Sequence, residues 1–421
     1  MKKIRIYNLS DCIIFSLIIL SLMPSVTFSI VSAEIFSWAL IFAILYTKRY
    51  NVSFIYFLVF LVINTLIGIL ATNGIYIGEA VRSLAAFLNP LFIFFFISQA
   101  PNKYVNYIYK IAKLYFLFLI ILGILQYFNL IAFLNPIFKF MIPRGSAISS
   151  GGIRGVRLLS SEPARATYEM FYLYLIFRND LNKKWGFFSD ILFTLYVILI
   201  LKSGTGIILL GLFYLLFYRK YFIIILIIIL FFISVLGFLS NNYVFNNRAM
   251  ILLINLFENP SNFMGILFDA SGFRLISIYS SFKYSFYHPF GGGIGNWQKT
   301  SLEAFNLTSF RPQDLSYFIY FANGQWTPVR PNSYLSSFAL DTGLVGMFLI
   351  LFFLYLMLRE YWKISKINNV YIILFFFYLF FTGEVGNPVP WIVTMTLLKY
   401  NKPKIGDREK TKSYFEFKAQ V

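Results

Sequence analysis

The sequence is poor in the side chains that carry most enzyme chemistry. Its 421 residues include one cysteine, one histidine and 17 acidic residues, against 36 lysines and arginines. The lone Cys12 excludes a disulfide framework and a cysteine-based metal site. The segments between the apolar runs hold no acidic cluster at metal-ligand spacing, so the sequence predicts no metal and no other cofactor. Arginine would then have to supply the positive charge that a metal ion supplies elsewhere.

The chain is rich in hydrophobic residues. Hydrophobic residues make up 59% of it and charged residues only 13%, and long apolar runs recur from Cys12 to Tyr400. Such runs can cross a hydrocarbon core of about 30 Å as helices that satisfy their own backbone. We therefore predict an all-α integral membrane protein with about 12 transmembrane helices. The predicted spans lie near residues 12–31, 33–47, 53–71, 82–98, 112–130, 166–178, 187–201, 204–217, 221–239, 334–358, 368–383 and 388–400.

The positive charge follows the predicted topology. The net charge of +19 would suit a nucleic-acid-binding protein, but lysine and arginine collect in short segments between apolar runs. Because such residues favour the cytoplasmic side, we predict two cytoplasmic termini and no nucleic-acid partner. The start has some features of a secretory signal, but a second apolar run follows at once and favours a membrane hairpin. The predicted parts are transmembrane helices 1–5 (residues 1–130), a first long outer loop (131–165), helices 6–9 (166–239), a large outer loop (240–333), helices 10–12 (334–400) and a cytoplasmic tail (401–421).

The two outer loops, in which we expect short surface helices, are rich in arginine. They hold 8 arginines and 3 lysines, whereas the predicted inside segments hold 6 arginines and 17 lysines. Positive-inside bias cannot explain arginine outside, and its planar fork of donors grips phosphate or carboxylate by paired hydrogen bonds. An anionic ligand such as a lipid pyrophosphate is the favoured explanation. The alternative is that these arginines pair with lipid headgroups or with acidic neighbours, which include Glu162, Glu258, Asp269, Glu303 and Asp314.

Three stretches in or beside these loops could carry chemistry. The first, "RGVRLLSSEPARATYEM" from Arg154 to Met170, places Arg157, Glu162 and Arg165 around a predicted helix start at Ser161-Glu162-Pro163. The amides of a helix start favour an anion. The plainer alternative is a capped helix without a ligand.

The second stretch is "SGFRLISIYSSFKYSFYHPFGGGIGNW". Arg274 begins a segment with helical spacing of apolar residues, which His288-Pro289 should end. Gly291, Gly293 and Gly295 would let backbone amides approach a ligand closely. No P-loop pattern is present, so a nucleotide is not expected.

The third stretch is "RPNSYLSSFALDTGLVGMFLILFF". Arg330 should lie just outside the membrane, and Asn332-Ser333 should cap a helix that begins at Tyr334. Gly343 and Gly346 would allow close packing against a neighbouring helix. Asp341 falls inside the span, where a carboxylate is a functional hypothesis by default.

Together these stretches resemble the superfamily of O-antigen polymerases and O-antigen ligases, which also includes capsule polymerases. The resemblance rests on Arg274, on His288-Pro-Phe-Gly-Gly-Gly-Ile-Gly-Asn296, and on Asn332-Ser-Tyr-Leu followed by Asp341-Thr-Gly-Leu-Val-Gly346. The segment from Arg157 to Pro163 is similar to an earlier outer-loop motif of that family. These motifs cover only part of the chain, and the layout of spans with a large late loop agrees over the rest.

The resemblance implies a metal-independent, integral-membrane glycosyltransferase of the bacterial cytoplasmic (inner) membrane. It would be a polysaccharide polymerase, moving a growing O-antigen or capsule glycan from undecaprenyl pyrophosphate onto another lipid-linked repeat unit on the outer face. A chain-length regulator and a flippase would act beside it, and membrane lipids would surround it. Glu162 and His288 are the candidate bases for the acceptor hydroxyl. The residues expected to bind pyrophosphate or glycan are Arg157, Arg165, Arg274, Arg330 and Asn332.

A ligase is the nearest enzymatic alternative. Ligases of the superfamily place a histidine just before the Asn-Ser pair, where this chain has Arg330-Pro331. The interval from Asn332 to Gly343 is also longer than the ligase spacing, and both departures favour a polymerase. A flippase or other transporter would be expected to carry charges near mid-membrane on broken helices. A cytoplasmic sugar-nucleotide transferase fits poorly, because the inside connections are short and carry no acidic metal-binding motif.

Overall fold

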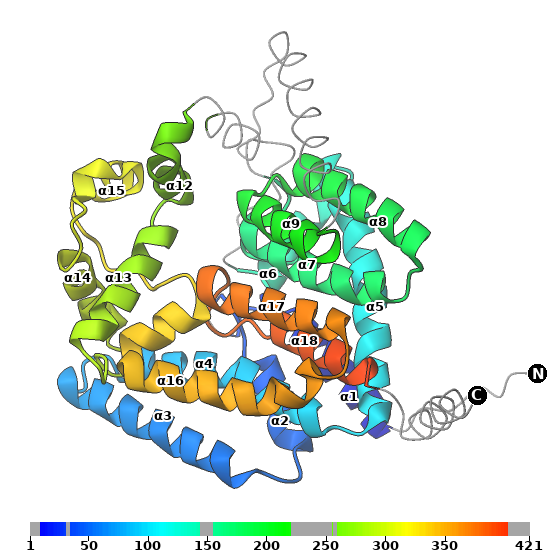
Figure 1. Ribbon diagram of the computed structural model, residues 1–421, viewed down its shortest axis with the longest axis horizontal. Helices are drawn as coiled ribbons and strands as arrows, with labels where there is room; N and C mark the ends of the chain where they lie inside the picture. The colour runs from blue at the N-terminus through cyan, green and yellow to red at the C-terminus, as the bar shows by residue number, and fades with distance from the viewer. Residues whose placement is uncertain (1–8, 31–33, 144–154, 220–254, 256–258, 403–421) are drawn as a thin grey trace, which may run out of the picture.

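The computed structural model of the protein describes residues 9–30, 34–143, 155–219, 255 and 259–402 (Figure 1). Every regular element among these residues is a helix. The first half contains α1 (Leu9–Leu22), α2 (Trp38–Tyr46), α3 (Val52–Ala71), α4 (Ile77–Gln99), α5 (Asn102–Tyr127), η1 (Ala132–Leu134), α6 (Asn135–Met141), α7 (Pro163–Asn179), α8 (Lys183–Tyr196), the π-helical η2 (Val197–Leu201) and α9 (Gly204–Phe217). The second half contains η3 (Pro260–Asn262), α12 (Phe263–Ser271), α13 (Arg274–Tyr287), α14 (Trp297–Asn306), η4 (Pro312–Asp314), α15 (Ser316–Ala322), α16 (Tyr334–Trp362), α17 (Lys366–Phe381) and α18 (Val389–Tyr400).

Several of these helices fit an α-helical membrane protein. Five segments of the described chain are long and apolar enough to span a membrane, namely α3, α4, α5, α8 continued by η2, and α16. Three shorter apolar helices are formed by most of α1 (Asp11–Leu22) and by the whole of α9 and α17. The predicted span at 221–239 lies outside the described residues. The prediction of an all-helical fold is therefore confirmed for the described residues and fits a membrane protein, whereas the number of spans and the side of the two termini stay predictions.

The two helices of the predicted first hairpin are shorter than the predicted spans at residues 12–31 and 33–47. α1 has 14 residues and α2 has nine, which at 1.5 Å per residue gives lengths of about 21 and 14 Å. The helical hydrogen bonds stop near Pro24, which has no N–H to continue them. The irregular chain beyond Pro24 is held by Trp38, whose indole N–H donates to the Val26 carbonyl at 2.7 Å. This irregular segment supplies two residues of the candidate site.

One end of the helix bundle gathers lysine and asparagine. Lys399 of α18 donates to the carbonyls of Ser98 and Ala100 at 3.1 and 2.7 Å, and so caps the C-terminal end of α4. Asn401 shares amide hydrogen bonds with Asn179 at the end of α7. We call this the basic end, after its Lys103, Lys110, Lys113, Arg178, Lys363, Lys366, Lys399 and Lys402. The chain enters α1 and leaves α18 at this end, because Asp11 lies 3.9 Å from Lys103 and Lys402 lies 3.5 Å from Glu360.

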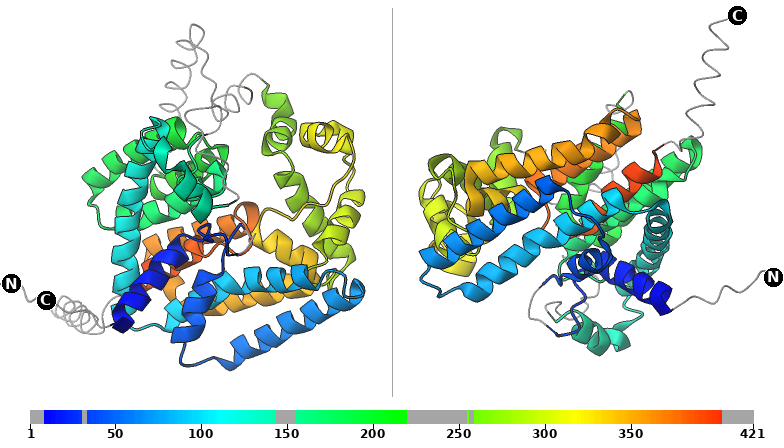
Figure 2. Two further views of the ribbon diagram at one scale, coloured as in Figure 1. Left: turned by 180° about the vertical axis from the view of Figure 1, so that it is seen from behind. Right: turned by 90° about the horizontal axis from the view of Figure 1, so that it is seen from below.

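The helices α12 to α15 form a separate layer beside the start of α16 and the end of α3 (Figures 1 and 2). They share a small apolar core of their own, which contains Ile276, Phe305 and Phe318. α13 packs along α16 and fastens this layer to the bundle. These short helices occupy the described part of the predicted large outer loop.

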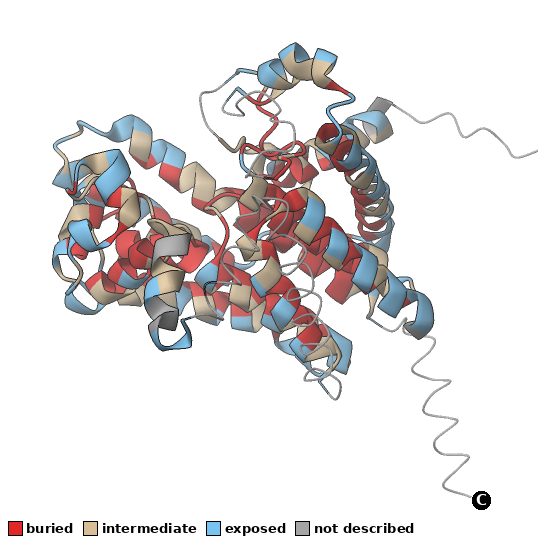
Figure 3. Ribbon diagram, turned by 90° about the horizontal axis from the view of Figure 1, so that it is seen from above, coloured by how far each residue is buried: buried red, intermediate tan, exposed pale blue. Residues whose placement is uncertain are grey.

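α7 and α18 lie at the centre of the bundle. Every residue of α7 from position 165 to 176 is buried, and so is every residue of α18 from 389 to 398. Seen from above, buried residues fill the middle of the molecule and exposed ones its periphery (Figure 3). A helix that is buried on all sides must satisfy its polar side chains inside the protein. The polar residues at the start of α7 are therefore held by protein groups.

Candidate functional site

The candidate site lies where α7 begins. α7 starts at Pro163, with Glu162 as the residue before the first turn, as predicted. Proline suits the first helical position, because its missing N–H is not needed there. The preceding turn is fixed by Gln126 of α5, whose amide group donates to the Leu158 carbonyl and accepts from the Leu158 N–H. Arg157 lies half-buried in this turn, and its carbonyl accepts from the Ser160 N–H at 3.0 Å.

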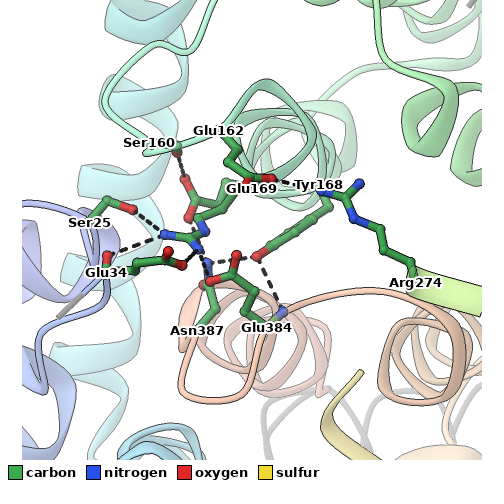
Figure 4. Close-up of polar contacts among 10 residues, drawn as sticks. Ser25, Glu34, Ser160, Glu162, Tyr168, Glu169, Arg274, Glu384 and Asn387 are labelled. Carbon is green, nitrogen blue, oxygen red and sulfur yellow. Dashed lines mark hydrogen bonds and ion pairs between the residues drawn. The ribbon is translucent and has the colours of Figure 1, made fainter. Parts of the chain in front are cut away.

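Arg165 is buried at the first turn of α7 and is paired with carboxylates. Only 1% of its side chain is exposed, and it forms ion pairs with Glu34, at 2.8 Å, and with Glu384. It also donates to the Ser25 hydroxyl and the Glu34 carbonyl, both at 3.2 Å (Figure 4). The guanidinium thus ties three distant segments together. It would have to give up these partners before it could grip a ligand phosphate.

Glu169 continues the same network one turn deeper. Its carboxylate accepts from the Ser160 hydroxyl at 2.5 Å and from the Asn387 amide at 2.6 Å. Asn387 also donates to the Tyr168 hydroxyl at 3.3 Å. These bonds join α7 to the connection at residues 382–388, between α17 and α18 (Figure 4). We call Arg165, Glu34, Glu384, Glu169 and Asn387 the Arg165 network.

Beside this network, the side chains of Arg274 and Glu162 form a partly exposed ion pair. They lie 112 positions apart in the sequence and meet at 2.7 Å. The side chain of Arg274 is 31% exposed and that of Glu162 50%. Arg274 begins α13 and Glu162 precedes α7, so the pair joins the outer helical layer to the bundle (Figure 4). A partly exposed pair keeps donors and acceptors available to a ligand.

Carboxylates outnumber arginines among the groups just described. Arg165 and Arg274 face Glu34, Glu162, Glu169 and Glu384. That Arg165 binds pyrophosphate stays a prediction, and its charge is already matched by two half-buried glutamates, Glu34 and Glu384. Arg274 is the arginine that remains within reach of a ligand.

The glycine loop at residues 288–296 does not offer its amides to a ligand. The amides of Gly292 and Gly293 donate to the carbonyls of Leu340 and Asp341 at 3.2 and 2.8 Å, and that of Ile294 donates to Asn64 at 3.2 Å. In return, the Val345 N–H donates to the Pro289 carbonyl at 3.0 Å. The glycines do let the loop backbone come close to other groups, as predicted. These groups are the backbones of α3 and α16, and not a ligand.

These hydrogen bonds fill a break in α16. The helix begins at Tyr334 with the predicted cap, in which the Ser333 hydroxyl accepts from Ser336. Gly343 leaves the helical conformation, with a φ of 67°, and a Cβ there would lie 2.1 Å from the Pro289 carbonyl oxygen. Gly346 is crowded by Thr342 and Phe338 of its own helix. Gly343 is thus in close contact with the glycine loop and Gly346 with α16 itself, and packing of the two glycines against a neighbouring helix stays a prediction.

Among the residues that the structure describes, none of the remaining predicted ones, His288, Arg330 and Asn332, forms a hydrogen bond or an ion pair with Arg274 or Glu162, and His288 lies at the other end of α13. His288 caps the far end of α13, where it is exposed and stacks on Tyr284 at 4.2 Å. Since α13 has 14 residues, this is about 20 Å from Arg274. Arg330 lies over the Phe87 ring at 5.7 Å, and burial lowers the pKa of its guanidinium. Asn332 is half-buried just before the cap of α16.

Sequence reasoning overlooked Glu34, Glu169, Glu384 and Asn387. The sequence could have indicated Glu169 and Glu384, because an ionisable residue inside or beside an apolar run is rare and is a functional candidate by default. Glu169 lies in the predicted span at 166–178, and Glu384 directly follows the span at 368–383. Glu34 carries no such signal, since it separates two apolar runs and reads as an ordinary turn residue.

Comparison with known proteins gave no relative. No family model, no curated protein and no solved structure matches this chain.

Proposed function

We propose that the protein is a membrane-embedded glycosyltransferase that polymerises oligosaccharide repeat units carried on undecaprenyl pyrophosphate. The observation that carries this proposal is the half-exposed Arg274–Glu162 pair at the start of α7, which combines a cation for the leaving pyrophosphate with a carboxylate for the acceptor hydroxyl. The likeness to O-antigen and capsule polymerases in the order of its motifs supports the same conclusion.

The distribution of charge gives the proposal an orientation. The basic end suits the cytoplasmic side of a bacterial inner membrane. The Arg274–Glu162 pair lies at the opposite end of α7 from Arg178, which belongs to the basic end. The reaction would then take place at the outer face, in a chain of about twelve spans with both termini inside.

The proposed reaction needs no cofactor. The bond between the donor anomeric carbon and the pyrophosphate oxygen breaks, and the leaving oxygen takes the electron pair beside Arg274. The acceptor hydroxyl forms the new bond to the anomeric carbon and passes its proton to Glu162, which later releases it to water. The Arg165 network holds Glu162 and the first turn of α7 in place. Arg157, Arg330 and Asn332 would contact more distant parts of the two substrates.

A transporter is the candidate from another class, and one observation favours it. Asp341 is a buried carboxylate beside a broken helix, which is an arrangement that transporters use. The glycine loop, however, takes up the backbone carbonyls of Leu340 and Asp341 at the break, so these carbonyls are not available to coordinate an ion. The occupied carbonyls at the break therefore favour an enzyme over a transporter.

The surface glycan of a deletion strain distinguishes a polymerase from a ligase and from a flippase. The glycan should contain single, unpolymerised repeat units if the protein is a polymerase. Normal core with polymer stranded on the lipid carrier would identify a ligase, and loss of lipid-linked units from the outer face would identify a flippase. Either of the last two results would overturn the proposal.

A further inference from the structure

A second group of buried polar side chains surrounds the break in α16. The carboxylate of Asp341, which is 1% exposed, is approached by the backbone N–H of Gly295 but forms no well-aligned hydrogen bond with any described residue. The side-chain oxygen of Asn296, which is 5% exposed, also lacks a hydrogen bond within the described part of the chain. The Nε and Nη2 atoms of Arg330 and the indole N–H of Trp297 are buried donors in the same state. Each such atom costs about 1–3 kcal/mol if it stays unpaired. A polar molecule is therefore expected among them.

These side chains converge through the glycine loop. The Asn296 amide donates to the Gly292 carbonyl at 3.1 Å, and the Gly293 N–H donates to the Asp341 carbonyl at 2.8 Å. Trp297 packs against an apolar cluster of Tyr284, Ala304 and Leu340, and Leu340 is the residue before Asp341. The charge of Arg330 acts on Asp341, yet the two side chains form no direct ion pair. Each of the two side chains therefore keeps buried polar atoms for a further partner.

The chemistry of these groups selects a neutral ligand. Arg330 would repel a cation and Asp341 would repel a phosphate, while their formal charges cancel. A hydroxyl fits both, because it can donate to a carboxylate and accept from a guanidinium N–H at the same time. Neighbouring hydroxyls on one ring would engage Asp341, Arg330 and Asn296 together. The half-buried indole of Trp297 adds an apolar face and one N–H donor.

We propose that Asp341, Arg330, Asn296 and Trp297 form a distal sugar-binding subsite, which holds one ring of the acceptor glycan away from the reacting end. The assignment rests on the proposed polymerase function. The subsite adjoins the end of α13 that carries His288, so about 20 Å of helix separates it from the Arg274–Glu162 pair. The sugar bound here is therefore not the one that reacts, and its role is to position the glycan.

The test uses the purified full-length protein in lipid nanodiscs. The probe is the free repeat-unit oligosaccharide, released by mild acid from the lipid-linked units of cells that lack the protein. Its affinity is measured by microscale thermophoresis, and the KM and kcat for polymerisation of lipid-linked units are measured in parallel. Asp341→Asn keeps the shape of the side chain and removes its charge. Lys299→Gln is the matched control, since this side chain on α14 is 68% exposed.

The expected result for Asp341→Asn is a loss of affinity of about tenfold, or about 1.4 kcal/mol, with a raised KM and an unchanged kcat. The amide still accepts a hydrogen bond, but a bond to a neutral group is weaker than one to a charged group. Lys299→Gln should bind as the wild type does. Trp297→Phe removes the indole N–H donor with a small loss of side-chain volume, so it should also weaken binding. It replaces Asp341→Asn as the test if that variant does not fold.

Equal affinities for the wild type, Asp341→Asn and Trp297→Phe would overturn the subsite. So would a wild type that polymerises lipid-linked units but does not bind the free oligosaccharide, which would mean that the site holds only water. In both cases the proposed function stands if polymer is made. A wild type that binds the oligosaccharide and makes no polymer would overturn the function instead.

Discussion

Arg165 and Arg274 have the same side chain and opposite surroundings. Arg165 is itself buried and pairs with two carboxylates, those of Glu34 and Glu384, whereas Arg274 shares a half-exposed contact with Glu162 alone. Buried ion pairs cost much when one partner is removed, and exposed pairs contribute little to stability. The two arginines should therefore respond differently to substitution, one in folding and the other in activity.

Arg274→Gln should abolish polymer while the protein level and Tm stay near those of the wild type. Loss of a cation at the leaving group typically lowers kcat at least 100-fold, or about 3 kcal/mol. Arg274→Lys keeps the charge without the paired donors, so it should retain part of the activity. Chain length on a glycan gel and the amount of protein in membranes are the two measurements. Normal polymer from Arg274→Gln would remove this residue from the mechanism.

Arg165→Met should destabilise the protein by about 3–5 kcal/mol, because Glu34 and Glu384 would then face each other without a cation. Adding Glu384→Gln should recover part of that loss, since it removes one of the two repelling charges. Thermal unfolding of the detergent-purified variants measures both effects. If Arg165→Met unfolds at the wild-type temperature, the Arg165 network is not structural.

His288→Gln should leave chain lengths close to normal. The histidine lies at the far end of α13 from the Arg274–Glu162 pair, so it cannot take the proton of the same acceptor hydroxyl without a large rearrangement. Glu162→Gln, by contrast, should reduce polymer strongly. The reverse pattern on a glycan gel would return the base role to His288.

At the scale of elements, the break in α16 and the glycine loop form one unit. The loop amides replace the helical donors that the carbonyls of Leu340 and Asp341 lose at Gly343. The fit leaves no space for side chains, because a Cβ on Gly293 would lie 2.4 Å from the Gly68 backbone and one on Gly295 would lie 2.3 Å from the Cα of Ala80. The glycines serve backbone packing between α3, α4 and α16.

Gly293→Ala should therefore destabilise the protein by about 2–4 kcal/mol, from crowding against α3 and from its φ of 85°. Gly211→Ala is the matched control, because nothing lies within 4 Å of the added Cβ and the residue is inside α9. Membrane-extracted yield and Tm are the measurements. Equal stability of the two variants would contradict the packing role of the loop.

At the scale of the whole molecule, the basic end and the outer layer lie at different ends of the helix bundle (Figure 1). Lys363 lies at the basic end, after α16, and Lys299 lies on α14 in the outer layer. The single Cys12 makes a labelling test simple, since Cys12→Ser leaves a background without cysteine. In intact spheroplasts, a membrane-impermeant maleimide should label Lys299→Cys, and it should label Lys363→Cys only after the membrane is permeabilised. Labelling of Lys363→Cys in intact spheroplasts would reverse the proposed orientation.

Local sequence signals predicted the helix starts and ends near the candidate site. Pro163, Arg274, Ser333 and the His288-Pro289 pair each lie at the predicted boundary, because caps and proline act on the backbone within one turn. The same signals overestimated the first hairpin. Apolar composition alone does not show where a helix ends when the next residues pack against another segment.

By itself, the sequence determined that this is a helical membrane protein, where its basic segments lie, and which stretches break the apolar pattern. These properties depend on composition and on neighbours within a few positions. Only the tertiary structure decided what the special residues touch, since Glu162 meets Arg274 across 112 positions and Glu169 meets Asn387 across 218. Arginines that look alike in the sequence differ because burial and a partner carboxylate, both set by packing, decide whether a charge is free to bind.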